Sequence, residues 1–166
     1  MREESKIRNL SDETTLYFND LGIKRNYWIN CDYVAPPYFT FKTRAQFSTF
    51  EFNGHSTQGM ALIQDLNFTL NRWSLGLRYA LFDTDDYDNR LYVYEKNVWL
   101  AYSFPAYYGV GVRNYVLLQY SLSKNTDLWL RWSHIRYINQ AEIGSGNETV
   151  AGNTGNDIKF QIRVRF

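Results

Sequence analysis

The chain has 166 residues, about the length of one domain, and a net charge of +1 from 18 Lys and Arg against 17 Asp and Glu. This balance gives no overall field that would attract nucleic acid, so we expect no direct nucleic-acid binding by this segment. Cys31 is the only cysteine, which excludes an intrachain disulfide and a multi-thiolate metal site.

Alternation with a period of two predicts an all-β chain, and the content of 14 Tyr, 11 Phe and 5 Trp suits half-buried strands. Residues 1–25 lack a clear pattern and are expected to form an outer loop or a poorly ordered N-terminal segment. About nine strands are expected beyond it, at 26–34, 38–51, 59–70, 73–83, 87–95, 98–106, 110–122, 126–138 and 157–166. Residues 26–166 would form an antiparallel up-and-down transmembrane β-barrel of about 8–10 strands, or the C-terminal part of a larger one.

These strands place apolar side chains on one face and polar side chains on the other. In residues 73–81, for example, Leu75 and Leu77 alternate with Gly76 and Arg78. A membrane barrel turns only every second residue toward lipid, which is compatible with a mean hydropathy of −0.47. Gln64 and His134 fall on the apolar face, and we expect a bulge or an interfacial position at each.

The connections alternate in length, as in outer-membrane barrels. Short ones are expected at 35–37, 71–72, 96–97 and 123–126, and longer polar ones near 52–58, 83–89, 105–110 and 139–156. About nine strands would then place residues 1–25 on the outer side, so that the chain forms only part of a barrel. The first six residues also lack the apolar region of a secretory signal, and we expect the true start to lie upstream.

The last strand predicts an outer-membrane assembly signal, in which a terminal aromatic follows apolar residues at every second position. Such a signal would make lipid and the barrel assembly machinery the partners of this chain. The residues that match are Ile158, Phe160, Ile162, Val164 and Phe166.

Residues 79–166 resemble the C-terminal barrel region of Bacteroidetes proteins called helix-hairpin-helix domain-containing proteins. The resemblance is carried by RYALFDTD at 78–85, RLYVYE at 90–95, SFPAYYG at 103–109, IGSG at 143–146 and GNT at 152–154. It implies a location in the bacterial outer membrane and a helix-hairpin-helix segment upstream of the barrel, which is absent here. It implies no particular activity.

A basic cluster is expected to face the lumen, where it could attract anionic solutes or hold a plug. The alternative is that carboxylates from missing upstream strands neutralise these charges, which then only brace the interior. The cluster comprises Lys42, Arg44, Arg78, Arg90, Arg113, Arg131, Lys159, Arg163 and Arg165.

Four acids crowd into one expected loop and are weak candidates for a calcium site, namely Asp83, Asp85, Asp86 and Asp88. A solvated acidic turn is the alternative, because the glycine and terminal glutamate of a calcium-binding loop are missing. Neither His55 nor His134 lies in a nucleophile motif, and Ser133 should point away from its neighbour His134. We therefore expect no catalytic residues and no cofactor.

The leading hypothesis is a non-enzymatic outer-membrane β-barrel protein that acts as a porin-like channel or as a membrane anchor for an upstream periplasmic domain. A soluble antiparallel β-barrel that binds a small apolar ligand is the alternative. An outer-membrane barrel hydrolase ranks third.

Overall fold

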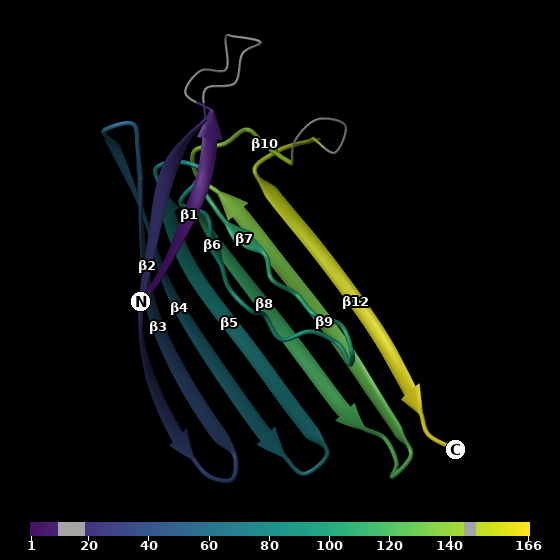
Figure 1. The fold of residues 1–166 in the computed structure, drawn as a ribbon. Coiled ribbons are helices and arrows are strands. Elements are labelled where there is room, and N and C mark those ends of the chain that lie inside the picture. The colour runs from purple at the N-terminus through teal and green to yellow at the C-terminus, as the bar shows by residue number, and fades with distance from the viewer. Residues whose placement is uncertain (10–18, 145–148) are drawn as a thin grey trace.

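The computed structural model describes residues 1–9, 19–144 and 149–166, and these residues contain strands and no helix. Eight strands form one antiparallel sheet in the order β1-β2-β3-β4-β5-β8-β9-β12 (Figure 1). Their bounds are β1 (Arg2–Asn9), β2 (Asn19–Ala35), β3 (Phe39–Phe52), β4 (His55–Leu70), β5 (Trp73–Thr84), β8 (Val110–Ser121), β9 (Thr126–Tyr137) and β12 (Thr154–Val164). The all-β antiparallel prediction is confirmed, but the sheet is not closed into a barrel, since β1 and β12 are its two edges.

Residues 85–109 leave the sheet after β5 and return to it at β8. They contain two short paired strands, β6 (Leu91–Tyr92) and β7 (Ala106–Tyr107), and they lie over one face of the sheet (Figure 1). We call the covered face the inner face and the opposite one the outer face. A second short pair, β10 (Glu142–Ile143) and β11 (Val150–Ala151), belongs to the connection between β9 and β12.

The prediction of long sheet strands at 87–95 and 98–106 is therefore wrong. Residues 89–95 are extended and alternate as expected, with Leu91 and Val93 buried and Tyr92 and Tyr94 exposed. Their alternation reflects packing of one side against the sheet, and such a pattern cannot be told from that of a strand inside the sheet.

The expected loop at 1–25 is also wrong in part, because Arg2–Asn9 forms β1 and β2 already begins at Asn19. Residues 10–18 of that segment lie outside the described residues. β1 carries Arg2, Glu4 and Lys6 on its inner face and has no apolar face that would reveal it as a strand. Because the sheet has eight antiparallel strands, β1 and β12 run in opposite directions. The start of β1 therefore faces the same end of the sheet as the finish of β12, and not the opposite, outer end as expected.

Short connections at 36–38, 71–72 and 122–125 share one end of the sheet, as expected (Figure 1). The long connections, 85–109 and 138–153, leave the sheet and return to it at the other end. There, however, the expected loop at 52–58 is a tight turn between β3 and β4. Asn53 and Gly54 have φ values of 48° and 74°, the left-handed pair that a two-residue hairpin requires.

The predicted faces are confirmed. Large apolar side chains point outward from the sheet, among them Ile29 at 73% exposed, Leu62 at 51% and Ile158 at 71%. Of the two alternatives at Gln64 and His134, the bulge is wrong, because both residues occupy regular ladder positions, with Gln64 opposite Thr43 and His134 opposite Asn114. The interfacial position stays a prediction.

The apolar core lies on the inner face, between the sheet and residues 89–107. Its buried members are Ala61, Ile63, Ala80, Phe82, Leu91, Val93, Tyr107 and Tyr137. Gly59 allows the close approach of this segment, because a Cβ there would lie 3.1 Å from the carbonyl oxygen of Asn89.

No helix long and apolar enough to cross a membrane occurs in residues 1–9, 19–144 or 149–166.

Candidate functional site

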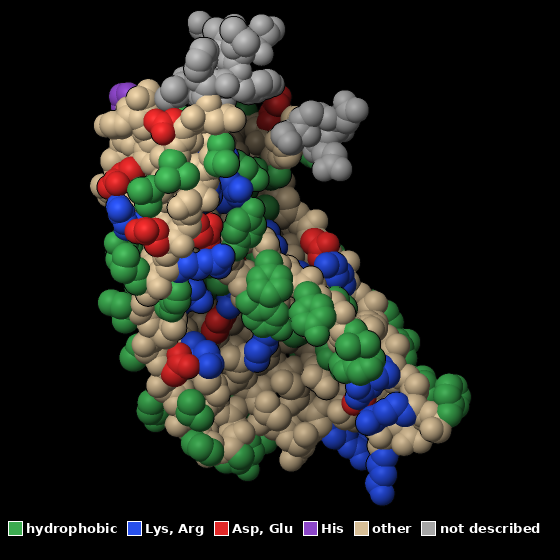
Figure 2. All heavy atoms as spheres, in the orientation of Figure 1, with side chains coloured by type: hydrophobic (Ala, Val, Ile, Leu, Met, Phe, Trp, Pro, Cys, Tyr) green, Lys and Arg blue, Asp and Glu red, His purple; other side chains and the backbone are tan. Residues whose placement is uncertain are grey.

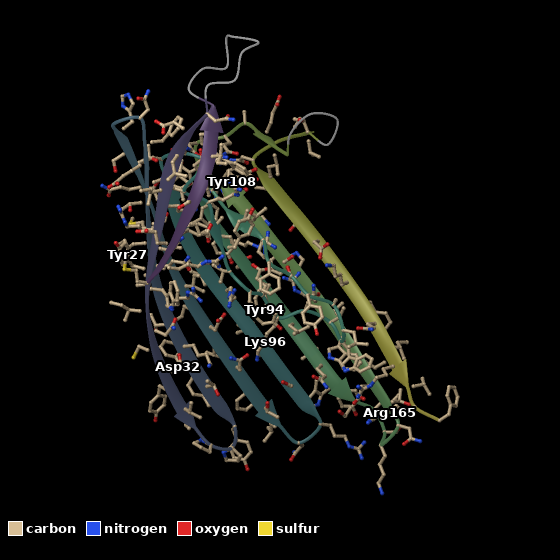
Figure 3. The ribbon with its side chains drawn as sticks, in the orientation of Figure 1. Tyr27, Asp32, Tyr94, Lys96, Tyr108 and Arg165 are labelled. Atoms are coloured by element: carbon tan, nitrogen blue, oxygen red, sulfur yellow. The ribbon has the colours of Figure 1, made fainter. Side chains whose placement is uncertain are left out.

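Residues 94–96 lie against the middle of the inner face, where three adjacent strands each present an arginine to them. Arg78 of β5 donates to the carbonyl of Tyr94 (2.6 Å), and Arg131 of β9 donates to the carbonyl of Lys96 (3.0 Å). The side chain between them, Glu95, pairs with Arg131 and with Arg113 of β8. Figure 3 shows Tyr94 and Lys96 in this central position. The arginines therefore fix the segment to the sheet.

Glu95 is fully buried, and both of its carboxylate oxygens are occupied. Oε1 accepts hydrogen bonds from Arg113 Nε (2.6 Å) and the Tyr107 hydroxyl (2.9 Å), and Oε2 accepts from Arg131 Nη2 (2.7 Å) and Arg113 Nη2 (3.1 Å). A buried charge is tolerated when it is paired and fully hydrogen-bonded, as Glu95 is.

Arg78 forms a second ion pair, since its Nε and Nη2 each donate to one oxygen of Asp65 at 2.6 Å. The Tyr115 ring lies between Arg78 and Arg131, at 5.5 Å and 5.1 Å from their guanidinium carbons. Cation–π contacts of this kind add to the two ion pairs and join them into one network.

Glu95 and Asp88 belong to residues 85–109, outside the long strands of the sheet. Their carboxylates should make the unfolding free energy depend on pH. Burial acts to raise the pKa of Glu95, but the hydrogen bond and charge of Arg113 outweigh it and lower the pKa below its ordinary 4.5. The hydrogen bond from Arg8 lowers the pKa of Asp88 below its ordinary 3.8. A depressed pKa contributes stability above the ordinary value that is lost as pH falls through the folded value. We expect the unfolding free energy to be flat near neutral pH and to fall below pH 4.5, a trend that denaturant titrations at several pH values would test.

Arg90 belongs to the connection between β5 and β8, so its predicted place on the wall of the sheet is wrong. The remaining predicted lumen residues lie on the inner face, and most of them pair with carboxylates of this chain. Lys42 pairs with Asp32 (2.9 Å), both Arg163 (2.5 Å) and Arg165 (3.3 Å) reach Asp127, and Lys159 lies 3.7 Å from Asp157. The sequence does not show which acids pair with these cations, and Glu95 pairs with Arg113 and Arg131 of strands β8 and β9. Only the cross-strand register could reveal these partners.

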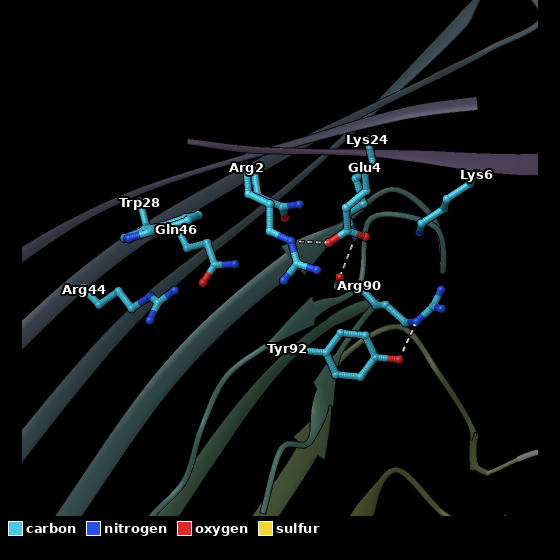
Figure 4. A pocket seen from close by; sticks show the side chains of 10 residues that line it. Arg2, Glu4, Lys6, Lys24, Trp28, Arg44, Gln46, Arg90 and Tyr92 are labelled. Carbon is cyan, nitrogen blue, oxygen red and sulfur yellow. Dashed lines mark hydrogen bonds and ion pairs between the residues drawn. The ribbon is translucent and has the colours of Figure 1, made fainter. Parts of the chain in front are cut away.

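Arg44 and Arg90 are the predicted lumen residues that form no ion pair among the described residues. They line a pocket of about 210 Å³ at the β1 edge, together with Arg2, Lys6, Lys24 and Glu4 (Figure 4). In Figure 2, which views the open side of the sheet, Lys and Arg side chains gather in the hollow.

Comparison with known proteins gives no match to this chain: no family model, no curated protein and no solved structure is significantly similar to it.

The four acids of the expected calcium loop do not gather at one point: Asp83 is an exposed residue of β5, and the other three have separate partners. Asp85 accepts from the Gln58 amide (2.8 Å), Asp86 accepts from the Thr57 hydroxyl (2.6 Å), and Asp88 pairs with Arg8. The described residues contain no group of three or more His, Cys, Asp or Glu that could hold a metal ion. Asp85, Asp86 and Asp88 accept hydrogen bonds that tie the connection between β5 and β8 to the sheet.

His134 and Ser133 lie on opposite faces of β9, as their adjacency implies. Ser133 accepts a hydrogen bond from Arg131 on the inner face (2.9 Å), whereas His134 lies 3.0 Å from the Asn156 side-chain oxygen on the outer face. The structure does not bring these two residues together as a nucleophile and base.

The five residues of the predicted assembly signal share the outer face of the edge strand β12 and its end. Ile158, Phe160, Ile162 and Val164 are between 51% and 71% exposed, and Phe166 follows the last strand residue. They extend the apolar outer face to the edge of the sheet.

Proposed function

We propose that this chain forms part of the wall of an outer-membrane β-barrel and acts there as a non-enzymatic membrane anchor. The observation that carries the proposal is the absence of charge from the outer face over most of the sheet. Asp, Glu, Lys and Arg are missing from the alternate outward positions of residues 27–33, 39–47, 60–70, 73–81, 112–120, 128–134 and 158–164. A lipid-facing surface requires this, because a charge at mid-bilayer is costly.

Several polar side chains on the outer face form hydrogen bonds within the sheet, although the buried side-chain oxygen of Asn114 has no partner. Thr43 donates to the Gln64 side-chain oxygen (3.0 Å), and the Gln64 amide donates to the Lys42 carbonyl (2.8 Å). Near the other edge, Trp132 Nε1 donates to the Asn156 side-chain oxygen (3.1 Å). Lipid offers no hydrogen-bond partners, so this local pairing favours the membrane over water as the medium.

Occupation of the inner face favours an anchor over a wide channel. Residues 85–109 reach across the inner face, because Asp88 pairs with Arg8 of β1 and the Trp99 ring lies 4.6 Å from Arg163 of β12. The buried Glu95 network fixes the middle of this segment. Because β1 and β12 do not pair with each other in this structure, the proposal requires that further strands pair with both edges to close the barrel.

The soluble alternative is less favoured because the apolar side chains point outward. A ligand-binding soluble barrel keeps its apolar side chains inside, whereas this inner face carries most of the charges. Exposure of the whole apolar outer face to water would create a patch far larger than the few hundred Å² that soluble monomers tolerate.

Two tryptophans of β9 provide a test of the proposal. Trp132 is 40% exposed on the outer face, whereas Trp129 is 4% exposed on the inner face. We expect a variant that retains only Trp132 to be quenched strongly by brominated lipids after reconstitution in vesicles, and a variant that retains only Trp129 to be quenched weakly. Equal quenching, or no association with vesicles, would contradict membrane insertion.

A further inference from the structure

The pocket at the β1 edge carries an excess of positive charge that the chain does not neutralise. Arg2, Lys6, Lys24, Arg44 and Arg90 line it, and Glu4 is the one acid among its lining residues. Glu4 pairs with Arg2 at 2.9 Å. Lys6 and Lys24 point to the connection of residues 85–109. There Lys24 donates to the carbonyls of Asp88 and Arg90, both at 2.7 Å. Lys6 also lies 3.8 Å from a carboxylate oxygen of Asp88, which Arg8 shares. Lys24, Arg44 and Arg90 form no ion pair among the described residues, so the pocket keeps an excess of positive charge.

Two side chains of β3 face this pocket with polar atoms that have no partner. Arg44 is held over the Trp28 ring at 5.7 Å, and its buried Nε has no hydrogen-bond acceptor. Gln46 is only 5% exposed, and its side-chain oxygen has no donor. A buried polar group without a partner costs free energy, so such groups usually mark the place of a ligand or a water molecule.

We propose that this pocket binds a small phosphate ester of a polyol, such as a sugar phosphate. The arginines match the geometry and charge of a phosphate group, which can accept two parallel hydrogen bonds from one guanidinium. The unpaired Gln46 oxygen requires a donor, which the dianionic group of a phosphate ester lacks and a hydroxyl group of the polyol provides. The rings of Trp28 and Tyr92 border the same space and can pack against a sugar (Figure 4).

The size and position of the pocket limit the ligand. A volume of about 210 Å³ is below that of a typical drug-sized site, so the ligand is a small molecule and not a polymer. The site lies on the inner face, and this inference goes beyond the proposed function, because it holds whatever medium surrounds the outer face.

Isothermal titration calorimetry on the whole chain in detergent micelles tests the ligand class. The probes are inorganic phosphate, glucose 6-phosphate, glucuronate and glucose. We expect glucose 6-phosphate to bind most tightly, inorganic phosphate more weakly, and glucose not at all. Glucuronate as the tightest ligand would overturn the phosphate assignment, and equal affinities for phosphate and glucose 6-phosphate would overturn the polyol assignment. Absence of binding by both phosphates would overturn the site.

Two variants separate the contribution of the phosphate group from that of the polyol hydroxyls. Circular dichroism is used to check that each variant folds. Arg44→Gln should weaken both phosphate ligands about tenfold or more, because it removes a charged hydrogen-bond donor. Gln46→Leu should weaken glucose 6-phosphate alone. Lys42→Gln is the matched control, since Lys42 lies on the same face of β3 but pairs with Asp32 outside the pocket. Equal weakening by Lys42→Gln and Arg44→Gln would show that the overall charge, and not this pocket, attracts the anion.

Discussion

Replacement of Glu95 by Gln is expected to destabilise the folded chain by about 3–5 kcal/mol, because it removes the counterion of Arg113 and leaves Arg131 with only the exposed Asp157, at 3.6 Å. Arg131 has 2% and Arg113 16% of its side chain exposed, so water compensates their charges poorly. A neutral amide also offers one acceptor oxygen where the carboxylate offers two. Denaturant unfolding in detergent micelles measures the change.

Asp32→Asn is the matched control for Glu95→Gln. It makes the same chemical change in an ion pair with Lys42 whose side chains are 44% and 48% exposed. Exposed pairs contribute about 0–1 kcal/mol, so the control should be nearly neutral. Limited proteolysis adds a local readout, because loss of Glu95 should expose residues 85–109 to cleavage. Equal stability of the two variants would show that the Glu95 network does not hold the segment.

Local alternation made the faces of the sheet predictable from the sequence. A strand turns successive side chains to opposite faces, so the inward position of Arg78 and the outward position of Leu77 follow from their neighbours alone. The same logic placed Ile158 and Phe160 on one face of the last strand. The short turns at 71–72 and 122–125 were predictable because their polar residues separate two clear alternating runs.

Features that depend on distant residues could not be predicted in this way. The sequence shows that Arg113 and Arg131 point inward, but only the register of β8 with β9 and the path of residues 85–109 bring both to Glu95. The same alternation at 89–95 predicted a wall strand, since a segment that packs against a sheet and a strand within it share one pattern. β1 was missed because its pairing with β2 needs no apolar face.

The ion pair of Arg78 with Asp65 changes the stability effect that the sequence alone predicts for replacing Arg78. An inward arginine in a water-filled lumen should tolerate Arg78→Leu, but Arg78 is 8% exposed and holds both oxygens of Asp65. Its loss would leave a carboxylate largely buried and unpaired. Arg78 is therefore unsuitable as a permissive control for the outer face, and a position on the outer face itself is needed.

Leu77→Arg is expected to cost about 2–4 kcal/mol in lipid, because Leu77 lies in the middle of the uncharged outward positions of β5 and would place a cation near mid-bilayer. Asp83→Arg is the matched control. Asp83 shares the outer face of β5 but is exposed and already charged at the end of the strand, where a new arginine should cost about 0–1 kcal/mol. Unfolding titrations of both variants in lipid vesicles and in micelles measure the difference. A similar cost at both positions would contradict the burial of the outer face in lipid.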